Sequence, residues 1–140
     1  MSGMRPFRPI LDRLHQAGLR PTRQRMALAK LMFEGRDCHV TAESLHAQAI
    51  THRVRVSLAT VYNTLHQFTS AGLLREIVID AARSYFDTNT SDHHHFYWEG
   101  TGLLEDIPSD QIIMEKLPSP PPGTTIKRID VVIRLAGCTK

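Results

Sequence analysis

The stretch SLATVYNTLHQFTSAG, residues 57–72, has the pattern of one helix with two unlike faces. Ser57 can cap its N-terminus, and Gly72 is placed to end it. Apolar side chains recur at steps of three, four and three residues and predict a face packed on a core: Leu58, Val61, Leu65 and Phe68. The opposite face carries hydrogen-bonding side chains and no acidic group: Thr60, Tyr62, Asn63, His66 and Gln67. Such a face is suited to contact the edges of DNA bases.

Three shorter helices are expected before this one. The first is amphipathic and stops at Gly18. The second is capped by Thr22 and ends near Gly35. The third begins after Thr41 and runs to about His52.

Three arginines, Arg20, Arg23 and Arg25, cluster at the start of the second helix. Positive charges near a helix N-terminus are slightly unfavourable because they oppose the helix dipole. Their presence there indicates an external anion, such as a phosphate of nucleic acid.

The segments LLREIVID (73–80) and RSYFD (83–87) alternate around a short turn and predict a β-hairpin. Short helices followed by a two-stranded ribbon indicate a winged helix-turn-helix domain. An ordinary helical bundle with a hairpin is the alternative.

The remainder of the chain predicts a small α/β domain. Strands are expected at HFYW (95–98), GLLEDI (102–107) and 124–137, with a short helix over 109–117 and a rigid Pro-rich connector between that helix and the last strand. Such a sheet is too small to bury its faces alone, so we expect a homodimer. The predicted fold class is α+β: residues 1–87 form the winged-helix DNA-binding domain, 88–92 a hinge, and 93–140 a dimerisation and metal-sensing domain.

Charge is distributed unevenly along the chain. Residues 1–75 hold 11 Lys and Arg against 4 Asp and Glu, whereas residues 76–140 hold 6 against 10. A basic half indicates a polyanionic partner, and an acidic half rich in histidine is compatible with cation binding. No long apolar run or secretory signal is present, so a cytoplasmic protein without a membrane span is expected. Cys38 and Cys138 lie far apart and do not indicate a disulfide framework.

Three adjacent histidines follow the predicted hinge. On a strand, His93 and His95 face the same side at roughly 6.6 Å between Cα atoms, whereas His94 points the other way. Asp87 and Asp106, at the ends of neighbouring strands, supply carboxylates, and one more imidazole stands just before the third helix, at His39. A ligand set of nitrogen and oxygen atoms without sulfur suits Fe(II) or Mn(II). Zn(II) is also a candidate, because it binds such sites more tightly than either.

Two other classes of function compete with a DNA-binding regulator. A metal-dependent hydrolase is conceivable, but the chain lacks a His-Glu-x-x-His helix, a serine nucleophile elbow and a Gly-rich phosphate loop. A function in protein–protein interaction alone would not explain the cluster of three arginines or the absence of acidic residues from one face of the helix at residues 57–72.

The chain resembles the ferric uptake regulator family of metal-sensing winged-helix repressors. The resemblance covers about residues 15–138 and rests on AGLRPTRQR (17–25), CHVTAESL (38–45), SLATVYNTLHQFTSAGL (57–73), SYFD (84–87) and HHH (93–95). It implies a regulatory metal site formed by His39, Asp87, His93, His95 and Asp106. Glu105 is the alternative ligand if the register shifts by one residue.

The resemblance also implies a DNA-binding surface: Arg20, Arg23, Arg25, Ser57, Thr60, Tyr62 and Asn63. Tyr62 and Asn63 would reach the major groove, with Tyr62 against a thymine methyl, and Arg20 would enter an A·T-rich minor groove. The implied function is metal-dependent, iron-responsive regulation of transcription by a homodimer on A·T-rich inverted repeats.

Several positions depart from the family pattern. Asp87 and Asp106 stand where most members have Glu, and Asn63 replaces a basic residue. The two Cys-x-x-Cys pairs that hold structural zinc are absent, because Trp98 and Thr101 occupy the first pair and Cys138 alone remains of the second.

Ile113 lies roughly where an auxiliary metal site expects Glu, which argues against a second metal at His94. The triple histidine and the missing cysteines make the chain similar to the iron response regulator subgroup. Members of that subgroup sense haem, so haem bound axially by His94 or a neighbour, under Phe96, Tyr97 and Trp98, is the runner-up ligand.

Overall fold

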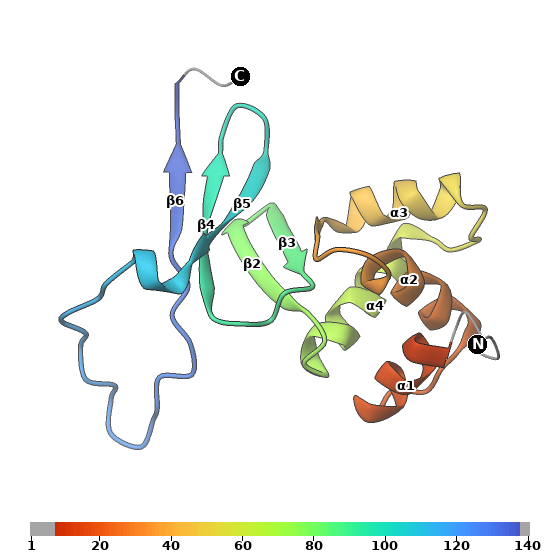
Figure 1. Cartoon of the computed structure of the whole chain (residues 1–140), viewed down its shortest axis with the longest axis horizontal. Helices are drawn as coiled ribbons and strands as arrows, with labels where there is room; N and C mark the ends of the chain where they lie inside the picture. Colours follow the sequence, from red (N-terminus) through yellow and green to blue (C-terminus); the bar gives the residue numbers. More distant parts are fainter. Residues whose placement is uncertain (1–7, 138–140) are drawn as a thin grey trace. The chain divides into compact units, whose positions relative to one another are not determined.

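The computed structural model describes residues 8–137 of the chain (Figure 1). It divides into two compact units, of which the first ends at Thr90 and the second begins at Ser91. The first unit contains four helices and a three-stranded sheet: α1 (Arg8–Gln16), α2 (Arg23–Phe33), β1 (His39–Val40), α3 (Ala42–Thr51), α4 (Leu58–Ser70), β2 (Arg75–Asp80) and β3 (Arg83–Asp87). This is the predicted winged helix-turn-helix arrangement, with β2 and β3 as the wing.

Capping side chains begin three of these helices: Thr22 and Ser57 cap α2 and α4 as predicted, and Thr41 caps α3, which was expected to begin after it. The hydroxyls of Thr22, Thr41 and Ser57 accept hydrogen bonds from backbone N–H groups three residues later, at 3.2, 3.0 and 3.1 Å. Each such cap stabilises a helix by about 1 kcal/mol. The sequence positions of α2, α3 and α4 are therefore set by short-range hydrogen bonds.

The apolar face of α4 packs into the core of the first unit. Val61, Leu65 and Phe68 are fully buried, as expected from their spacing. The prediction for Leu58 was wrong: it is 39% exposed, because it follows the N-cap directly in the first turn, where the chain enters from an exposed loop. Thr64 takes the fourth buried position instead.

The sheet of the first unit has β3 in the middle, in the order β1-β3-β2. Asp87, the last residue of β3, is the register partner of His39 in β1 and of Arg75 in β2. A carboxylate thus lies at the end of the central strand with a nitrogen-bearing residue on each neighbouring strand.

The second unit is a three-stranded sheet made of β4 (His93–Trp98), β5 (Leu103–Pro108) and β6 (Val132–Leu135). β4 is central, and it pairs antiparallel with β5 and parallel with β6. The fold class is therefore α+β, as predicted.

The helix expected over 109–117 is not formed. A single 3₁₀ turn, η1 (Ser109–Gln111), stands in its place, and no regular element follows until β6. A short helix is marginal unless an apolar face is packed, and Ile113 is 82% exposed in the single chain. The last strand is also shorter than the predicted 124–137, because β6 pairs only with the part of β4 from His95 onward.

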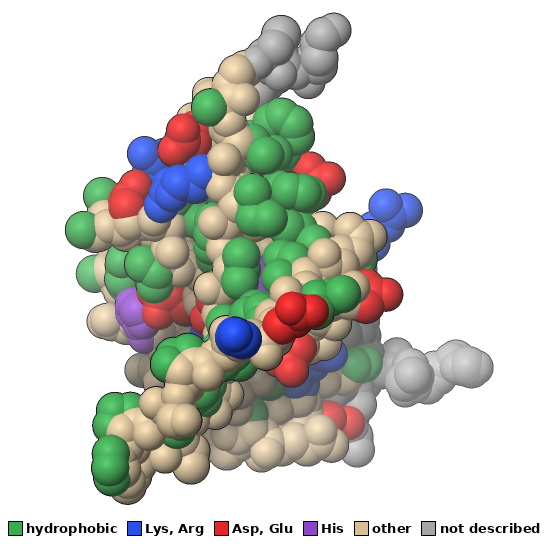
Figure 2. Space-filling view, turned by 90° about the vertical axis from the view of Figure 1, so that its left-hand side faces the viewer, with side chains coloured by type: hydrophobic (Ala, Val, Ile, Leu, Met, Phe, Trp, Pro, Cys, Tyr) green, Lys and Arg blue, Asp and Glu red, His purple; other side chains and the backbone are tan. Residues whose placement is uncertain are grey.

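Apolar side chains remain exposed on the second unit: Leu103, Ile113, Leu117, Ile126 and Ile133. Figure 2 shows hydrophobic side chains gathered on the face turned toward the viewer. Among residues 8–137, no helix is long and apolar enough to cross a membrane.

The contrast between two leucines of α4 gives a test of this core. Leu65→Ala should lower the free energy of unfolding by about 2–5 kcal/mol, because it leaves a cavity among buried side chains. Leu58→Ala on the same helix should change it by less than about 1 kcal/mol. Urea denaturation of the full chain followed by circular dichroism measures both, and equal midpoints for the two variants would contradict this assignment of the buried face.

Candidate metal centre and nucleic-acid interface

A histidine and a carboxylate meet at one edge of the first unit. His39 Nε2 lies 3.1 Å from Asp87 Oδ2. The other carboxylate oxygen, Oδ1, accepts a hydrogen bond from the backbone N–H of Asn89 at 2.8 Å. Asp87 is fully buried, so its charge depends on these partners. One oxygen is fixed by the backbone while the other is directed to the imidazole.

A second group of ligand atoms lies within the second unit. His93 Nε2 and His95 Nε2 are each 3.3 Å from the same atom, Asp106 Oδ1. The two imidazole rings are 4.6 Å apart between centroids. His95 and Asp106 are register partners on β4 and β5, so strand pairing itself brings these side chains together.

The backbone sets the tautomer of His93. Its Nδ1 lies 2.6 Å from the carbonyl oxygen of Ser91. Because a carbonyl only accepts, Nδ1 carries the proton, and the lone pair of the neutral ring is on Nε2, the atom that faces Asp106. A hydrogen bond of this kind on the far nitrogen orients a metal-binding imidazole and raises its basicity.

His94 points to the other face of β4. Its Nδ1 accepts a hydrogen bond from the backbone N–H of Val131 at 3.1 Å. The neutral ring therefore carries its proton on Nε2. In this arrangement neither nitrogen of His94 presents a free lone pair, which sets it apart from His93.

The residues present fit a divalent cation. Two ligand atoms that bind one ion at about 2.1 Å and at a right angle lie about 3.0 Å apart. The nitrogen to oxygen distances of 3.1 and 3.3 Å within each pair are close to that value. The donor set contains nitrogen and oxygen without sulfur, which suits Fe(II), Mn(II) and Zn(II).

Two neighbouring residues are poor ligands for such an ion. The carboxylate of Glu105 accepts a hydrogen bond from Trp98 Nε1 at 3.0 Å, on the opposite face of β5 from Asp106. Burial raises the pKa of the Cys38 thiol; a hydrogen bond from Thr88 lowers that pKa, and Asp87 and Asp37 raise it further. Cys38 is thus a neutral thiol at pH 7 rather than a thiolate ligand.

A polar hollow of about 410 Å³ lies between the start of α2 and the exposed face of α4. It is lined by Arg20, Thr22, Gln24, Arg25, Thr60, Asn63, Thr64 and Gln67. The Arg25 guanidinium donates to Gln67 Oε1 at 2.9 and 3.2 Å and to the carbonyl oxygen of Arg20 at 2.9 Å. Arg25 therefore joins the loop before α2 to α4.

Three other predicted DNA-binding residues lie outside this hollow: Ser57, Tyr62 and Arg23. Tyr62 is 44% exposed on α4, next to the ring of His66. The hydroxyl of Ser57 caps α4, because it accepts a hydrogen bond from the backbone N–H of Thr60. Arg23 does not line the hollow that contains Arg20 and Arg25.

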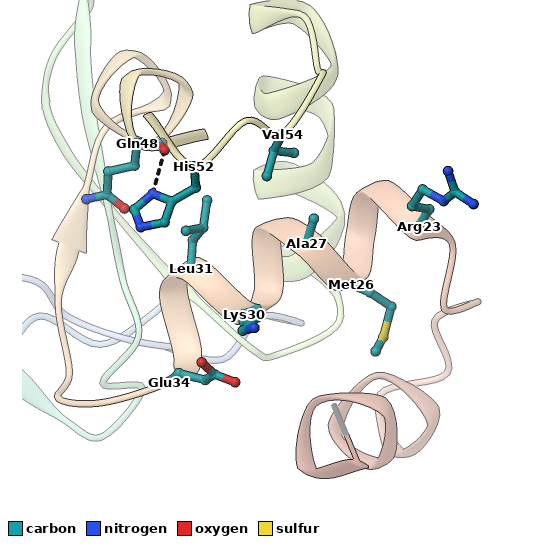
Figure 3. Close-up of a pocket in the computed structure, with 9 residues that line it drawn as sticks. All are labelled: Arg23, Met26, Ala27, Lys30, Leu31, Glu34, Gln48, His52 and Val54. Carbon is teal, nitrogen blue, oxygen red and sulfur yellow. Dashed lines mark hydrogen bonds between the residues drawn. The ribbon is translucent and has the colours of Figure 1, made fainter. Parts of the chain in front are cut away.

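Arg23 instead borders a larger groove of about 840 Å³ between α2 and the end of α3 (Figure 3). Apolar side chains of α2 and Val54 form much of its lining, and His52 Nδ1 donates to the carbonyl oxygen of Gln48 at 2.9 Å. Sequence reasoning missed this groove, because its residues come from a helix and a turn that are adjacent only in the folded unit.

Comparison with known proteins gives a family. The model of the ferric uptake regulator family matches residues 16–132. The peroxide-responsive repressor PerR of Staphylococcus aureus strain Mu50 is 32% identical over 99 residues, which are 71% of this chain and 66% of that protein. The match thus spans just under two thirds of the relative's length.

Solved structures share the fold. The ferric uptake regulator from Pseudomonas aeruginosa with manganese has a TM-score of 0.69 at 23% identity, over 92% of this chain and 98% of its own. The Vibrio cholerae ferric uptake regulator has a TM-score of 0.71 at 21% identity, over 91% and 98%. Since the family model covers most of the chain, the protein belongs to the ferric uptake regulator family.

Proposed function

We propose that this chain is a cytoplasmic, metal-dependent transcriptional regulator that binds A·T-rich inverted repeats of DNA as a homodimer. The observation that carries the proposal is the pair of histidine–carboxylate groups on the two sides of segment 88–92. One group ends β3, and the other begins β4. Membership of the ferric uptake regulator family supports a regulator rather than an enzyme.

The ligands of the proposed metal site are His39, Asp87, His93, His95 and Asp106. The first two belong to the DNA-binding unit, and the other three belong to the second unit. Three nitrogen and two oxygen atoms favour Fe(II) or Mn(II), with Zn(II) as the competitor by affinity. Such an ion would supply positive charge to two carboxylates, Asp87 and Asp106, that lie beside imidazole nitrogens.

The proposed response follows from the position of these ligands in the chain. An ion held by both groups would restrict segment 88–92. In a dimer, that restriction would set the separation of the two α4 helices, which must match the helical repeat of DNA. Moving the equilibrium from 1:99 to 99:1 takes about 5.5 kcal/mol of differential affinity for the metal-bound state.

The second unit is the proposed dimerisation surface. Among residues 91–137, which the structure describes, this unit forms no α-helix, and it exposes several large apolar side chains. A second copy of the chain would remove these side chains from water. The absence of the structural zinc cysteines from the sequence means that the apolar contact would hold the dimer.

The proposed DNA contacts divide by their role. Tyr62 and Asn63 would read bases in the major groove, and Arg20 would enter the minor groove. Arg23 and Arg25 would hold phosphates, while Ser57 and Thr60 lie at the N-terminus of α4, where backbone N–H groups favour an anion.

The three histidines provide the test of the metal site. His93→Ala and His95→Ala should each reduce Mn(II)-stimulated binding to operator DNA at least tenfold, because each removes a nitrogen ligand. His94→Ala, a matched variant from the same strand, should leave the metal response nearly intact. Fluorescence anisotropy with and without Mn(II) measures the three variants, and an equal metal response in all of them would refute the site.

Haem is the alternative ligand, and the same variants distinguish it. An axial histidine must project alone into an apolar pocket, so haem would make His94→Ala the most damaging change. The hydrogen bond from Val131 to His94 Nδ1 argues against this role. Loss of the Soret shift in His94→Ala alone, on titration with haem, would favour haem over the metal.

Base reading by α4 has its own test. Tyr62→Ala should weaken binding to the operator by about 1–3 kcal/mol and relax the preference at one thymine. Its binding to random DNA should change little. Competition assays with operator and random duplexes measure the difference, and equal losses on both would show that Tyr62 reads no base.

A response to peroxide is the second candidate function, since the Staphylococcus aureus relative is a peroxide-responsive repressor. Fe(II) at the proposed site would be open to oxidation by peroxide, whereas Mn(II) resists it. Brief treatment with hydrogen peroxide should therefore abolish operator binding by the Fe(II)-loaded protein and spare the Mn(II)-loaded protein. If peroxide abolished operator binding by both metal-loaded forms, or by neither, peroxide sensing at this metal would be excluded.

A further inference from the structure

Three helices of the first unit end in the same hydrogen-bonded motif. The backbone N–H groups of Leu19, Val54 and Leu73 each donate to a carbonyl oxygen five residues earlier, at 2.9, 2.8 and 2.9 Å. This is the Schellman end of a helix, in which the residue before the donor takes a left-handed conformation. Those residues, at the ends of α1, α3 and α4, are Gly18, Arg53 and Gly72.

Arg53 is the exception among these three positions. Its φ angle is 59°, and it is the only non-glycine residue with positive φ in the described part of the chain. A side chain in this region is strained, whereas glycine is not. Because glycine serves at the two equivalent ends, the arginine at position 53 indicates a use for its guanidinium group.

Two other arginines line the same hollow as Arg53. Arg23, Arg53 and Arg55 line a hollow of about 380 Å³, together with Gln24, Ala27 and Val54. No carboxylate is among the lining residues, and none of the three arginines forms an ion pair with a described residue. Three like charges around one hollow repel one another unless an anion lies between them.

The hollow adjoins the proposed DNA-binding surface. Gln24 lines both this hollow and the polar hollow beside α4, and its Nε2 donates to the carbonyl oxygen of Arg55 at 3.4 Å. Arg55 precedes the N-cap of α4, Ser57, by two residues. Figure 3 shows Arg23 at the start of α2, with its guanidinium turned away from Met26.

We propose that Arg53 and Arg55, with Arg23, bind a backbone phosphate of the DNA beside the major groove that α4 enters. This inference rests on the proposed DNA-binding function. All three side chains are exposed, and exposed charges hold a single small anion weakly because water and salt screen them. A duplex presents its phosphates in a row, so this contact would act together with those of α2 and α4.

The decisive variant is Arg53→Gly, because it separates binding from folding. It removes the charge and also the left-handed strain, so the thermal midpoint should stay equal or rise. The slope of log K against log[NaCl] for random DNA should become shallower, by up to about 0.9, which is the contribution of one phosphate. Operator affinity should fall by the same factor as random-DNA affinity, since no base is read.

Three further variants complete the test. Arg55→Ala should reduce the slope in the same way, and Arg53→Lys should retain it because the charge remains. Arg36→Ala is the matched control: it removes one exposed arginine beyond the other end of α2, a helix about 16 Å long, and should leave the slope unchanged. Slopes for Arg53→Gly and Arg55→Ala equal to that of Arg36→Ala would overturn the proposal.

Two other results are distinguishable. If the wild-type protein prefers operator DNA over random DNA but the salt slope of Arg53→Gly is unchanged, this phosphate contact is refuted and the proposed function is not. Wild-type protein without any operator preference would reject sequence-specific regulation, whereas a reduced slope in Arg53→Gly would still support the phosphate contact. A third result would overturn the proposal. If calorimetry shows that the wild-type protein binds inorganic phosphate and Arg53→Gly does not, while the DNA slope of Arg53→Gly is unchanged, the hollow binds a small anion instead of DNA.

Discussion

The buried carboxylate of Asp87 connects separate parts of the first unit. A charged group withdrawn from water needs partners for both oxygens, and Asp87 finds them in the His39 ring and the backbone N–H of Asn89. One side chain thereby joins β1, the end of the central strand β3 and the beginning of the segment that leads to the second unit. Removal of the His39 ring would take a polar partner from a carboxylate that is fully buried, and such a loss is costly.

The second unit repeats the same chemistry with a different degree of burial. Asp106 is 40% exposed, and it faces two imidazoles rather than one. A cation would gain most from Asp87, where competing water is excluded, while Asp106 and its two histidines supply the larger number of ligand atoms. In the proposed site, the first unit thus supplies the buried carboxylate of Asp87, and the second unit supplies the imidazole nitrogens of His93 and His95 beside Asp106.

The sequence predicted those features that depend on short-range patterns. The caps at Thr22 and Ser57, the start of a helix after Thr41 and the hairpin around Asp80 follow from local hydrogen bonding. The alternation of the three histidines follows from the two-residue period of a strand. The pairing of His95 with Asp106 depends on strand register, which the structure shows; the family resemblance implied only that both residues belong to one metal site. Features set by tertiary context were missed: the exposure of Leu58, the absent helix after Ser109, and the grouping of Arg53 with Arg23 across a turn.

The parallel pairing of β4 with β6 also governs the order in which the chain can fold. A parallel neighbour requires a long crossover, and here β5, η1 and an irregular segment separate Trp98 from Val132. The contacts of the first unit are all available once residue 90 has been synthesised, whereas the sheet of the second unit closes only when its last strand has emerged. During synthesis α4, the helix proposed to read DNA, can therefore be complete before the histidine-bearing strand β4 has both neighbours. The nascent chain passes through a stage in which α4 is folded, but the proposed metal control is not yet assembled.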